Sequence, residues 1–283
     1  MKIVTAVVNN PTFIEIQYHT LKKYFKGDYE FIVFNDAKDF PDMTNGNDVT
    51  IKAKIETTCQ NLGIRCINIP NEDHKQMNMS TRHADTFNNH VLMFQKQNPD
   101  KYLLLDSDMF LIDTFDIEKY SNYDCAIVLQ SRNNYSLNYI WPGLFYVDFS
   151  KIQNIELLDW RPTDYCDTGG MMKEWLQLQM NGSNMPNTDE IRWTDKKFHN
   201  ETIYFIKHLW GSSWDETELP TNLQERHNII DFLNQDVRNE NNKFFCEIYD
   251  DVFLHYRAGS NWNGEGMELH NCLTNLLKKV LMD

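Results

Sequence analysis

Two aspartates in the middle of the chain offer the strongest candidate chemistry. Asp106 and Asp108 end an apolar run, Tyr102 to Leu105, which is typical of a strand buried on both faces of a sheet. Side chains alternate along a strand, so the two carboxylates share one face, with Cα atoms roughly 6.5 Å apart. In open α/β sheets, ligands bind beyond the carboxyl ends of the strands. The pattern therefore predicts a ligand site built on paired carboxylates.

The residues after the pair bear on whether it is buried. Asp and Ser favour turns, so an ordinary turn is the competing interpretation. The apolar stretch Met109 to Ile112 favours a pair that is carried inward, where an unpaired charge is costly. Carboxylate oxygens suit Mn²⁺ or Mg²⁺, which share their coordination with substrate phosphates. A calcium-binding EF-hand loop is excluded, because Leu111 stands where that loop needs glycine.

A buried strand followed by Asp-Ser-Asp resembles the Asp-x-Asp motif of metal-dependent nucleotide-sugar glycosyltransferases with the GT-A fold. The resemblance implies that Asp106 meets the ribose or the metal and that Asp108 chelates the divalent ion on the donor diphosphate. It also implies that both acids belong to the catalytic centre.

A histidine near the end of the chain is the candidate third metal ligand. His255 follows the apolar run Val252 to Leu254, although a lone histidine at a strand end is more often a satisfied surface group. In GT-A enzymes a histidine on a late strand frequently completes the shell of the ion. By the same resemblance, Arg257 would neutralise the diphosphate, and Gly259 and Ser260 would offer it backbone N–H groups.

The surroundings of this histidine differ from the His-x-x-Gly-x-x-Lys-Pro-Trp pattern of glycogenin-like retaining enzymes. The glycine stands one position late and there is no lysine. Membership of that branch is therefore possible but not assigned.

The N-terminal part of the chain should bind the nucleotide. Its strand–helix–strand pattern has no Gly-x-Gly-x-x-Gly turn, which agrees with a phosphate held by a metal. In GT-A enzymes the turns after the first two strands cradle the base and the ribose. The resemblance thus makes Val8, Asn9 and Asp36 nucleotide candidates, with ordinary turn residues as the alternative.

Two more charged residues are candidates by resemblance. Arg82 lies on the predicted helix before the central strand and would present its cation to the donor; a solvated helix face is the alternative. Asp167 precedes a later helix, where it would meet sugar hydroxyls or act as the catalytic carboxylate. An ordinary helix cap is the alternative for Asp167.

Aromatic residues mark the expected acceptor side. Trp141 precedes Pro142 and Gly143, which predict a bend or a close backbone approach inside an apolar run. The region 181–240 adds Trp193, Trp210 and Trp214, which suit stacking on a sugar, although tryptophan is also a common core residue.

The elements that must position these residues alternate between strands and helices. This order predicts an α/β, GT-A (Rossmann-like) fold with a mixed, mostly parallel sheet flanked by helices. We expect one domain over 1–283, with a nucleotide-binding half at 1–113 and an acceptor half at 114–283. The predicted strands are Ile3 to Val8, Glu30 to Phe34, Arg65 to Ile69, Tyr102 to Leu105, Tyr123 to Leu129 and Tyr139 to Phe149, and the predicted helices are Thr12 to Phe25, Ile51 to Leu62, Ser80 to Gln95, Met171 to Leu178, Thr202 to Trp210 and Glu268 to Leu281.

Composition narrows the class of protein. The net charge of −14, from 41 acids against 27 Lys and Arg, opposes a nucleic-acid-binding surface. The six cysteines include no Cys-x-x-Cys pair, which favours buried free thiols in a reducing compartment. No apolar stretch is long enough for a signal peptide or a membrane span. We expect a cytoplasmic protein, with peripheral membrane contact left open.

The favoured function is transfer of a hexose from a nucleotide diphosphate sugar, with UDP as the preferred nucleotide, to a glycan or another hydroxyl acceptor. Nucleotidyl transfer, sugar-nucleotide hydrolysis and a non-catalytic sugar-binding module are the alternatives. Neither the stereochemistry nor the acceptor can be read from these motifs.

Overall fold

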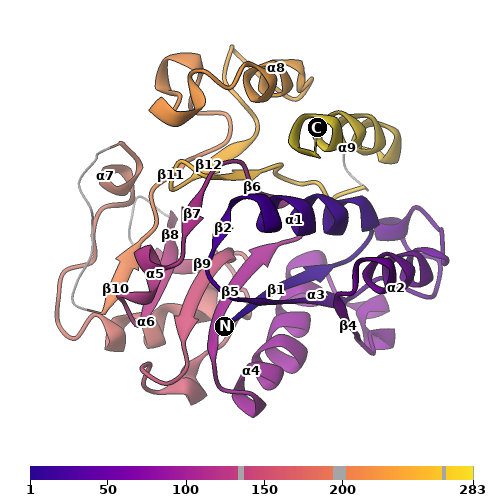
Figure 1. Cartoon of the computed structure of the whole chain (residues 1–283). Coiled ribbons are helices and arrows are strands. Elements are labelled where there is room, and N and C mark those ends of the chain that lie inside the picture. The colour runs from indigo at the N-terminus through magenta and orange to yellow at the C-terminus, as the bar shows by residue number, and fades with distance from the viewer. Residues whose placement is uncertain (133–136, 194–201, 263–265, 283) are drawn as a thin grey trace.

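The computed structural model describes residues 1–132, 137–193, 202–262 and 266–282, and it has an α/β architecture (Figure 1). Its main sheet has seven strands in the order β10-β8-β9-β5-β1-β3-β4. All neighbouring pairs are parallel except those that involve β9. The predicted mixed, mostly parallel sheet flanked by helices is therefore confirmed. The strands are β1 (Lys2–Val7), β3 (Glu30–Asn35), β4 (Arg65–Asn68), β5 (Lys101–Asp106), β8 (Cys125–Arg132), β9 (Leu137–Asp148) and β10 (Ile203–Phe205).

The register of the central strands places their carboxyl ends at one edge of the sheet. Val7 at the end of β1 pairs with Asn35 at the end of β3, and Ala6 pairs with Asp106 at the end of β5. The polar residues that follow these strands therefore meet at this edge, as expected for parallel strands.

A second sheet of four strands extends beyond this edge, in the order β11-β12-β13-β6. It is antiparallel, and its strand β6 continues the chain directly after the Asp-Ser-Asp segment. Register pairs Met109 of β6 with His255 of β13, which brings the middle and the end of the chain together. The strands are β6 (Met109–Leu111), β11 (His208–Leu209), β12 (Glu247–Tyr249) and β13 (Phe253–His255); a separate ribbon joins β2 (Phe25–Lys26) to β7 (Phe115–Asp116).

Helices cover both faces of the main sheet and one end of the molecule (Figure 1). Helix α1 has Pro11 in its first turn and is capped by Asn10, whose side chain accepts a hydrogen bond from the N–H of Thr12. The helices are α1 (Pro11–Tyr24), α2 (Ile51–Leu62), α3 (Met79–Asp85), α4 (Met93–Gln97), α5 (Glu118–Ser121), α6 (Lys173–Gln179), α7 (Thr188–Trp193), α8 (His227–Gln235) and α9 (Met267–Met282), and a π-helical segment, Thr86–Leu92, joins α3 to α4.

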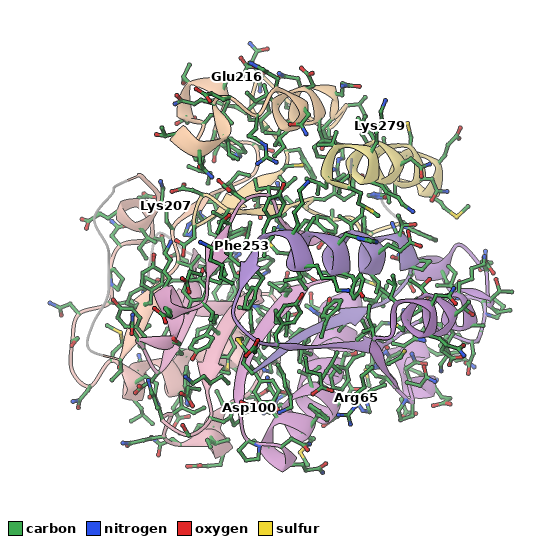
Figure 2. All side chains as sticks on the ribbon, in the orientation of Figure 1. Arg65, Asp100, Lys207, Glu216, Phe253 and Lys279 are labelled. Atoms are coloured by element: carbon green, nitrogen blue, oxygen red, sulfur yellow. The ribbon has the colours of Figure 1, made fainter. Side chains whose placement is uncertain are left out.

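Apolar side chains fill three clusters. One lies between the main sheet and α1 and α2, and it includes Ile14 and Ile55. A second lies on the other face, where Phe87 and Trp175 pack on the strands. The third joins the second sheet to α8 and α9. Figure 2 shows the side chains of all these layers. On the segment before β5, Phe87 and Val91 are buried in the second cluster and Phe94 packs against it.

One predicted helix is wrong. Thr202 to Trp210 contains the short strands β10 and β11 instead of a helix. Ile203 to Phe205 pair in parallel with Cys125 to Ile127 at the edge of the main sheet. Tertiary pairing overrides the weak local pattern here, and the β-branched and aromatic residues suit a strand.

The bend predicted at Trp141 to Gly143 is confirmed. The register between β8 and β9 shifts so that Ile127 pairs with Phe145 while the next residue, Val128, pairs with Trp141. The residues of β9 between these two pairs form a bulge next to the site described below. Such bulges change the direction of the side chains around them.

Two general features complete the fold. All six cysteines are free, and four of them, Cys59, Cys125, Cys166 and Cys246, are buried. Within the described residues, no helix has both the length and the apolar character that crossing a membrane requires.

Candidate functional site

The two acids and the late histidine converge. Asp106, Asp108 and His255 each offer a ligand atom, and these atoms all lie within 4.8 Å of one another. Asp106 ends β5, Asp108 precedes β6, and β6 pairs with the strand that carries His255. Two carboxylates and an imidazole form a donor set that suits Mn²⁺ and related divalent ions. The buried side chains at Met109 to Ile112 agree with the predicted inward course of the chain.

The loop after β13 holds Asp108 in place. The N–H of Gly259 donates to Oδ2 of Asp108 over 2.7 Å, and the N–H of Tyr256 donates to its backbone carbonyl over 2.9 Å. Ala258 adopts a left-handed conformation, with φ of 61°, to make this turn. A Cβ on Gly259 would lie 2.7 Å from the Tyr256 ring and 2.9 Å from Phe13. Glycine is therefore needed for its lack of a side chain.

The electrostatics of the cluster are strongly coupled. Burial and the neighbouring Asp108 raise the pKa of Asp106. Burial also disfavours the charged form of Asp108, but His255 and the N–H of Gly259 outweigh it, and the pKa of Asp108 is lowered. Burial lowers the pKa of His255, yet Asp108 and Glu247 raise it to about 10. The imidazole lies between these two acids, with Nε2 3.3 Å from Oδ1 of Asp108 and Nδ1 2.8 Å from Oε2 of Glu247.

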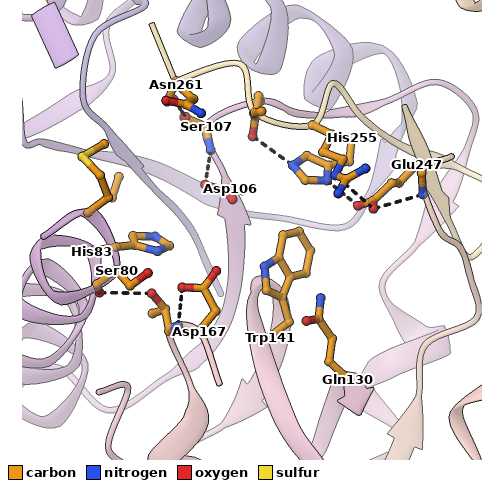
Figure 3. Close-up of a pocket in the computed structure, with 18 of the residues that line it drawn as sticks. Ser80, His83, Asp106, Ser107, Gln130, Trp141, Asp167, Glu247, His255 and Asn261 are labelled. Carbon is orange, nitrogen blue, oxygen red and sulfur yellow. Dashed lines mark hydrogen bonds and ion pairs between the residues drawn. The ribbon is translucent and has the colours of Figure 1, made fainter. Parts of the chain in front are cut away.

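A pocket of about 930 Å³ opens in front of this cluster (Figure 3). Most of the residues predicted from the sequence line it. They are Val8, Asp36, Arg82, Asp106, Asp108, Asp167, His255, Arg257 and Ser260. Asn9 and Gly259 lie behind its wall instead. The side-chain amide of Asn9 donates to the carbonyls of Thr44 and Ser260, each over 2.8 Å, and so holds two pocket loops together.

Asp36 is fully engaged within the protein. Its Oδ1 accepts from Nζ of Lys38 at 2.7 Å and from the amide of Asn71 at 2.9 Å, and its Oδ2 accepts from the hydroxyl of Thr86 at 2.9 Å. Lys38 is completely buried. Asp36 therefore shapes the pocket wall through these bonds.

The two predicted arginines differ in how they are held. Arg82 donates twice to the carboxylate of Asp42, at 3.1 and 3.0 Å, and its Nε donates to the carbonyl of Met77. Its charge is thus balanced by a neighbour. Arg257 has 41% of its side chain exposed and lies 3.8 Å from Glu247. Arg257 is therefore the more available of the two for an anionic ligand.

Asp167 faces the pocket from the opposite wall, near Ser80 and His83 (Figure 3). Among the described residues, its carboxylate accepts only the N–H of Thr168, over 2.8 Å. The alternative interpretation of Asp167 as a helix cap does not hold, because the following short helix, Gly170–Met172, has Gly169 at its N-cap. The Asp167 carboxylate is thus available to a ligand.

Several lining residues escaped the sequence analysis. Two of them have a signal in the sequence. Glu247 is a charged residue inside the apolar run Phe244 to Tyr249, and His83 follows Arg82 on the same helix. The others carry no local signal. The lining residues missed include Lys38, Thr44, His83, Gln130, Arg132, Thr188, Asp189 and Glu247.

The tryptophans divide between pocket and core. Trp141 and Trp210 line the pocket, whereas Trp214 is fully buried in the third cluster, so stacking on a ligand is wrong for Trp214. The side chain of Trp193 lies outside the described residues.

Comparisons with known proteins give matches among solved structures alone. No family model matches the chain, and no curated protein matches it. A crystal structure of an active-site mutant of LgtC resembles it, with 14% sequence identity and a TM-score of 0.38, over 67% of this chain and 68% of the other.

Proposed function

We propose that this protein is a metal-dependent glycosyltransferase that moves a hexose from a nucleotide diphosphate, preferably UDP, to a hydroxyl acceptor such as a glycan. The convergence of Asp106, Asp108 and His255 on one wall of a large pocket carries the proposal. The donor set fits Mn²⁺ or Mg²⁺, because it combines two carboxylates with an imidazole nitrogen. The Asp-x-Asp resemblance supports the same class of reaction.

When bound, the divalent ion would act as a Lewis acid that offsets charge on the departing diphosphate. Asp106, Asp108 and His255 would hold it. Arg257 is partly exposed beside them and would pair with a phosphate oxygen.

The donor nucleotide would lie along the carboxyl ends of β1 and β3. Val8 and Asp36 line this side of the pocket, and Asn9 fixes the loops that border it. Ser260 would offer its N–H or hydroxyl to the diphosphate.

Asp167 would serve the sugar or the acceptor. Its carboxylate faces the pocket with few internal bonds, so it could accept a hydrogen bond from a sugar hydroxyl or take a proton from the acceptor. An inverting reaction needs the second role, and a retaining one is compatible with the first.

A thermal-shift panel of UDP-, GDP- and CMP-sugars, with and without Mn²⁺, tests the proposal, followed by an assay of released nucleotide. We expect UDP-sugars to stabilise the protein only with Mn²⁺. The effect should disappear in Asp108→Asn and persist in the control Asp39→Asn, whose carboxylate is exposed and pairs with Lys52.

Two outcomes would contradict the proposal. Equal stabilisation by the nucleotide without metal would remove the metal from the mechanism. Nucleotide release at the same rate with and without any glycan acceptor, and with no glycosylated product, would point to a sugar-nucleotide hydrolase.

A further inference from the structure

We propose that Glu247 is the positioning residue that fixes His255 for cation binding. This inference rests on the proposed function, because it assigns the residue that supports one ligand of the proposed metal site. Glu247 and His255 face each other directly in the antiparallel pair β12–β13. Oε2 of Glu247 lies 2.8 Å from Nδ1 of His255, and Nε2 of the same ring points to Asp108.

This arrangement assigns different tasks to the two ring nitrogens. A carboxylate can only accept a hydrogen bond, so Nδ1 must keep its proton to bond with Glu247. Nε2 is the nitrogen on the side of Asp106 and Asp108, and it would offer its lone pair to a cation bound there. Metal-binding histidines commonly use their second nitrogen in this way, and the partner also raises the basicity of the ligand.

Glu247 is itself held by several donors. It is buried, with 5% of its surface exposed. The hydroxyl of Tyr249 donates to its Oε2 over 2.8 Å, and the N–H of Gly211 donates to its Oε1 over 3.1 Å. A Cβ on Gly211 would lie 2.3 Å from the carbonyl of Phe245, so this close approach requires glycine. The carboxylate therefore cannot rotate away from the imidazole without losing several hydrogen bonds.

An aromatic wall covers this bond on the pocket side. Trp141 stacks on Tyr249, with ring centroids 5.4 Å apart and planes 13° apart, and it is tilted against His255 at 5.1 Å. Figure 3 shows Trp141 below His255 and Glu247 beside the imidazole, to its right. Excluding water strengthens a hydrogen bond to a carboxylate, because the local dielectric constant is low.

The chain offers a matched control for burial. Asp250 is equally buried, with 4% of its surface exposed, and accepts hydrogen bonds from Tyr120 and Tyr204 over 2.8 and 3.2 Å. It does not line the pocket. Replacing Asp250 should therefore destabilise the fold without altering the cation site, whereas replacing Glu247 should affect both.

The test compares Mn²⁺ binding to the wild-type protein, Glu247→Gln and Asp250→Asn, measured from the EPR signal of free Mn²⁺. Glutamine keeps the shape of the side chain and removes its charge. We expect the dissociation constant to rise about tenfold in Glu247→Gln, in the range seen when partners of metal-binding histidines are lost. The constant of Asp250→Asn should match that of the wild type.

A second readout follows the tautomer in the wild-type protein. With diamagnetic Zn²⁺ bound, ¹⁵N NMR of the His255 ring should show the proton on Nδ1. This measurement tests the proposal even if Glu247→Gln fails to fold, because a proton on Nε2 of His255 would overturn it.

The outcomes separate the inference from the proposed function. Wild-type Mn²⁺ affinity in folded Glu247→Gln would overturn the role of Glu247 and leave the proposed transferase intact. Mn²⁺ binding that depends on Glu247, without any sugar transfer, would support this inference and contradict the transferase. A wild-type protein that binds no Mn²⁺ would contradict both.

Discussion

Oδ1 of Asp108 lies 3.3 Å from Nε2 of His255, although the two residues come from the middle and the end of the chain. The pairing of β6 with β13 produces this proximity, because it places Met109 directly opposite His255. The second sheet therefore assembles the candidate cation site, and the main sheet contributes Asp106 through the end of β5.

Removing the imidazole should weaken the binding of Mn²⁺. In His255→Ala the two carboxylates remain but lose the nitrogen ligand, so we expect the Mn²⁺ dissociation constant to rise at least tenfold. Isothermal titration with Mn²⁺ measures this. His208→Ala is the control, since His208 is buried in the same sheet on β11 and does not line the pocket. Wild-type Mn²⁺ affinity in His255→Ala would exclude the histidine as a ligand.

A methyl group at Gly143 should displace Trp141. A Cβ there would lie 2.0 to 2.5 Å from three atoms of the indole, so the ring cannot keep its stacked position. We expect Gly143→Ala to cost about 1 to 3 kcal/mol of stability, as overpacking typically does, and to weaken Mn²⁺ binding by exposing His255. Urea unfolding and Mn²⁺ titration measure the two effects.

A double-mutant cycle checks that the effect of Gly143→Ala acts through the indole. If it does, Gly143→Ala should add little once Trp141 has been replaced by alanine. Additive losses of Mn²⁺ affinity in the double variant would show that the glycine acts independently of the ring.

The candidate cation ligands could be predicted because each one is a polar residue at the end of an apolar run. The parallel strands bring the end of β5, with Asp106, to one edge of the main sheet. The place of His255 beside it was expected from the resemblance to GT-A enzymes, and the antiparallel second sheet brings it there. Six strands of the main sheet could be predicted from their apolar runs, whereas β10 lies in a segment that was expected to be a helix.

The residues that hold the candidate site in place could not be predicted in this way. Glu247 acquires its role only when β12 pairs with β13 in the observed register, and local sequence does not encode that register. Lys38 is similar, because its burial depends on Asp36 and on loops from elsewhere in the chain. The strands between Thr202 and Trp210 were missed because they have only two or three residues each, too few for a periodic signal.

The buried pair of Lys38 and Asp36 should be essential for stability. Both residues are almost entirely inaccessible, and Nζ lies 2.7 Å from the carboxylate. Lys38→Met would leave the Asp36 carboxylate buried without its lysine partner, so we expect a loss of about 3 to 5 kcal/mol in the free energy of unfolding. Urea denaturation measures it.

The control for this pair is Lys52→Met. Lys52 lies 3.6 Å from the more exposed Asp39, and such a pair contributes less than about 1 kcal/mol. A similar small loss in Lys38→Met would contradict a stabilising role for the buried pair.

The bond between Asp42 and Arg82 should make stability depend on pH in the acid range. Burial disfavours the ionised form of Asp42, but hydrogen bonds from Thr44 and Arg82 outweigh this and lower its pKa below 3.8. The native state therefore binds this proton less readily than the unfolded chain. The stabilisation is complete above pH 3.8 and is lost as the pH falls through the native pKa.

Asp42→Asn should then be less stable than the wild type by about 2 kcal/mol near neutral pH, because charged hydrogen bonds are lost. The difference should shrink as the pH falls below about 4, where the wild-type carboxylate also becomes protonated. Urea unfolding followed by tryptophan fluorescence between pH 7 and 3 measures both the difference at neutral pH and its decrease in acid. Asp39→Asn, with an exposed carboxylate, should differ from the wild type by less than about 0.5 kcal/mol throughout. A deficit of Asp42→Asn that stayed constant down to pH 3 would mean that the loss comes from packing instead of the ionised carboxylate.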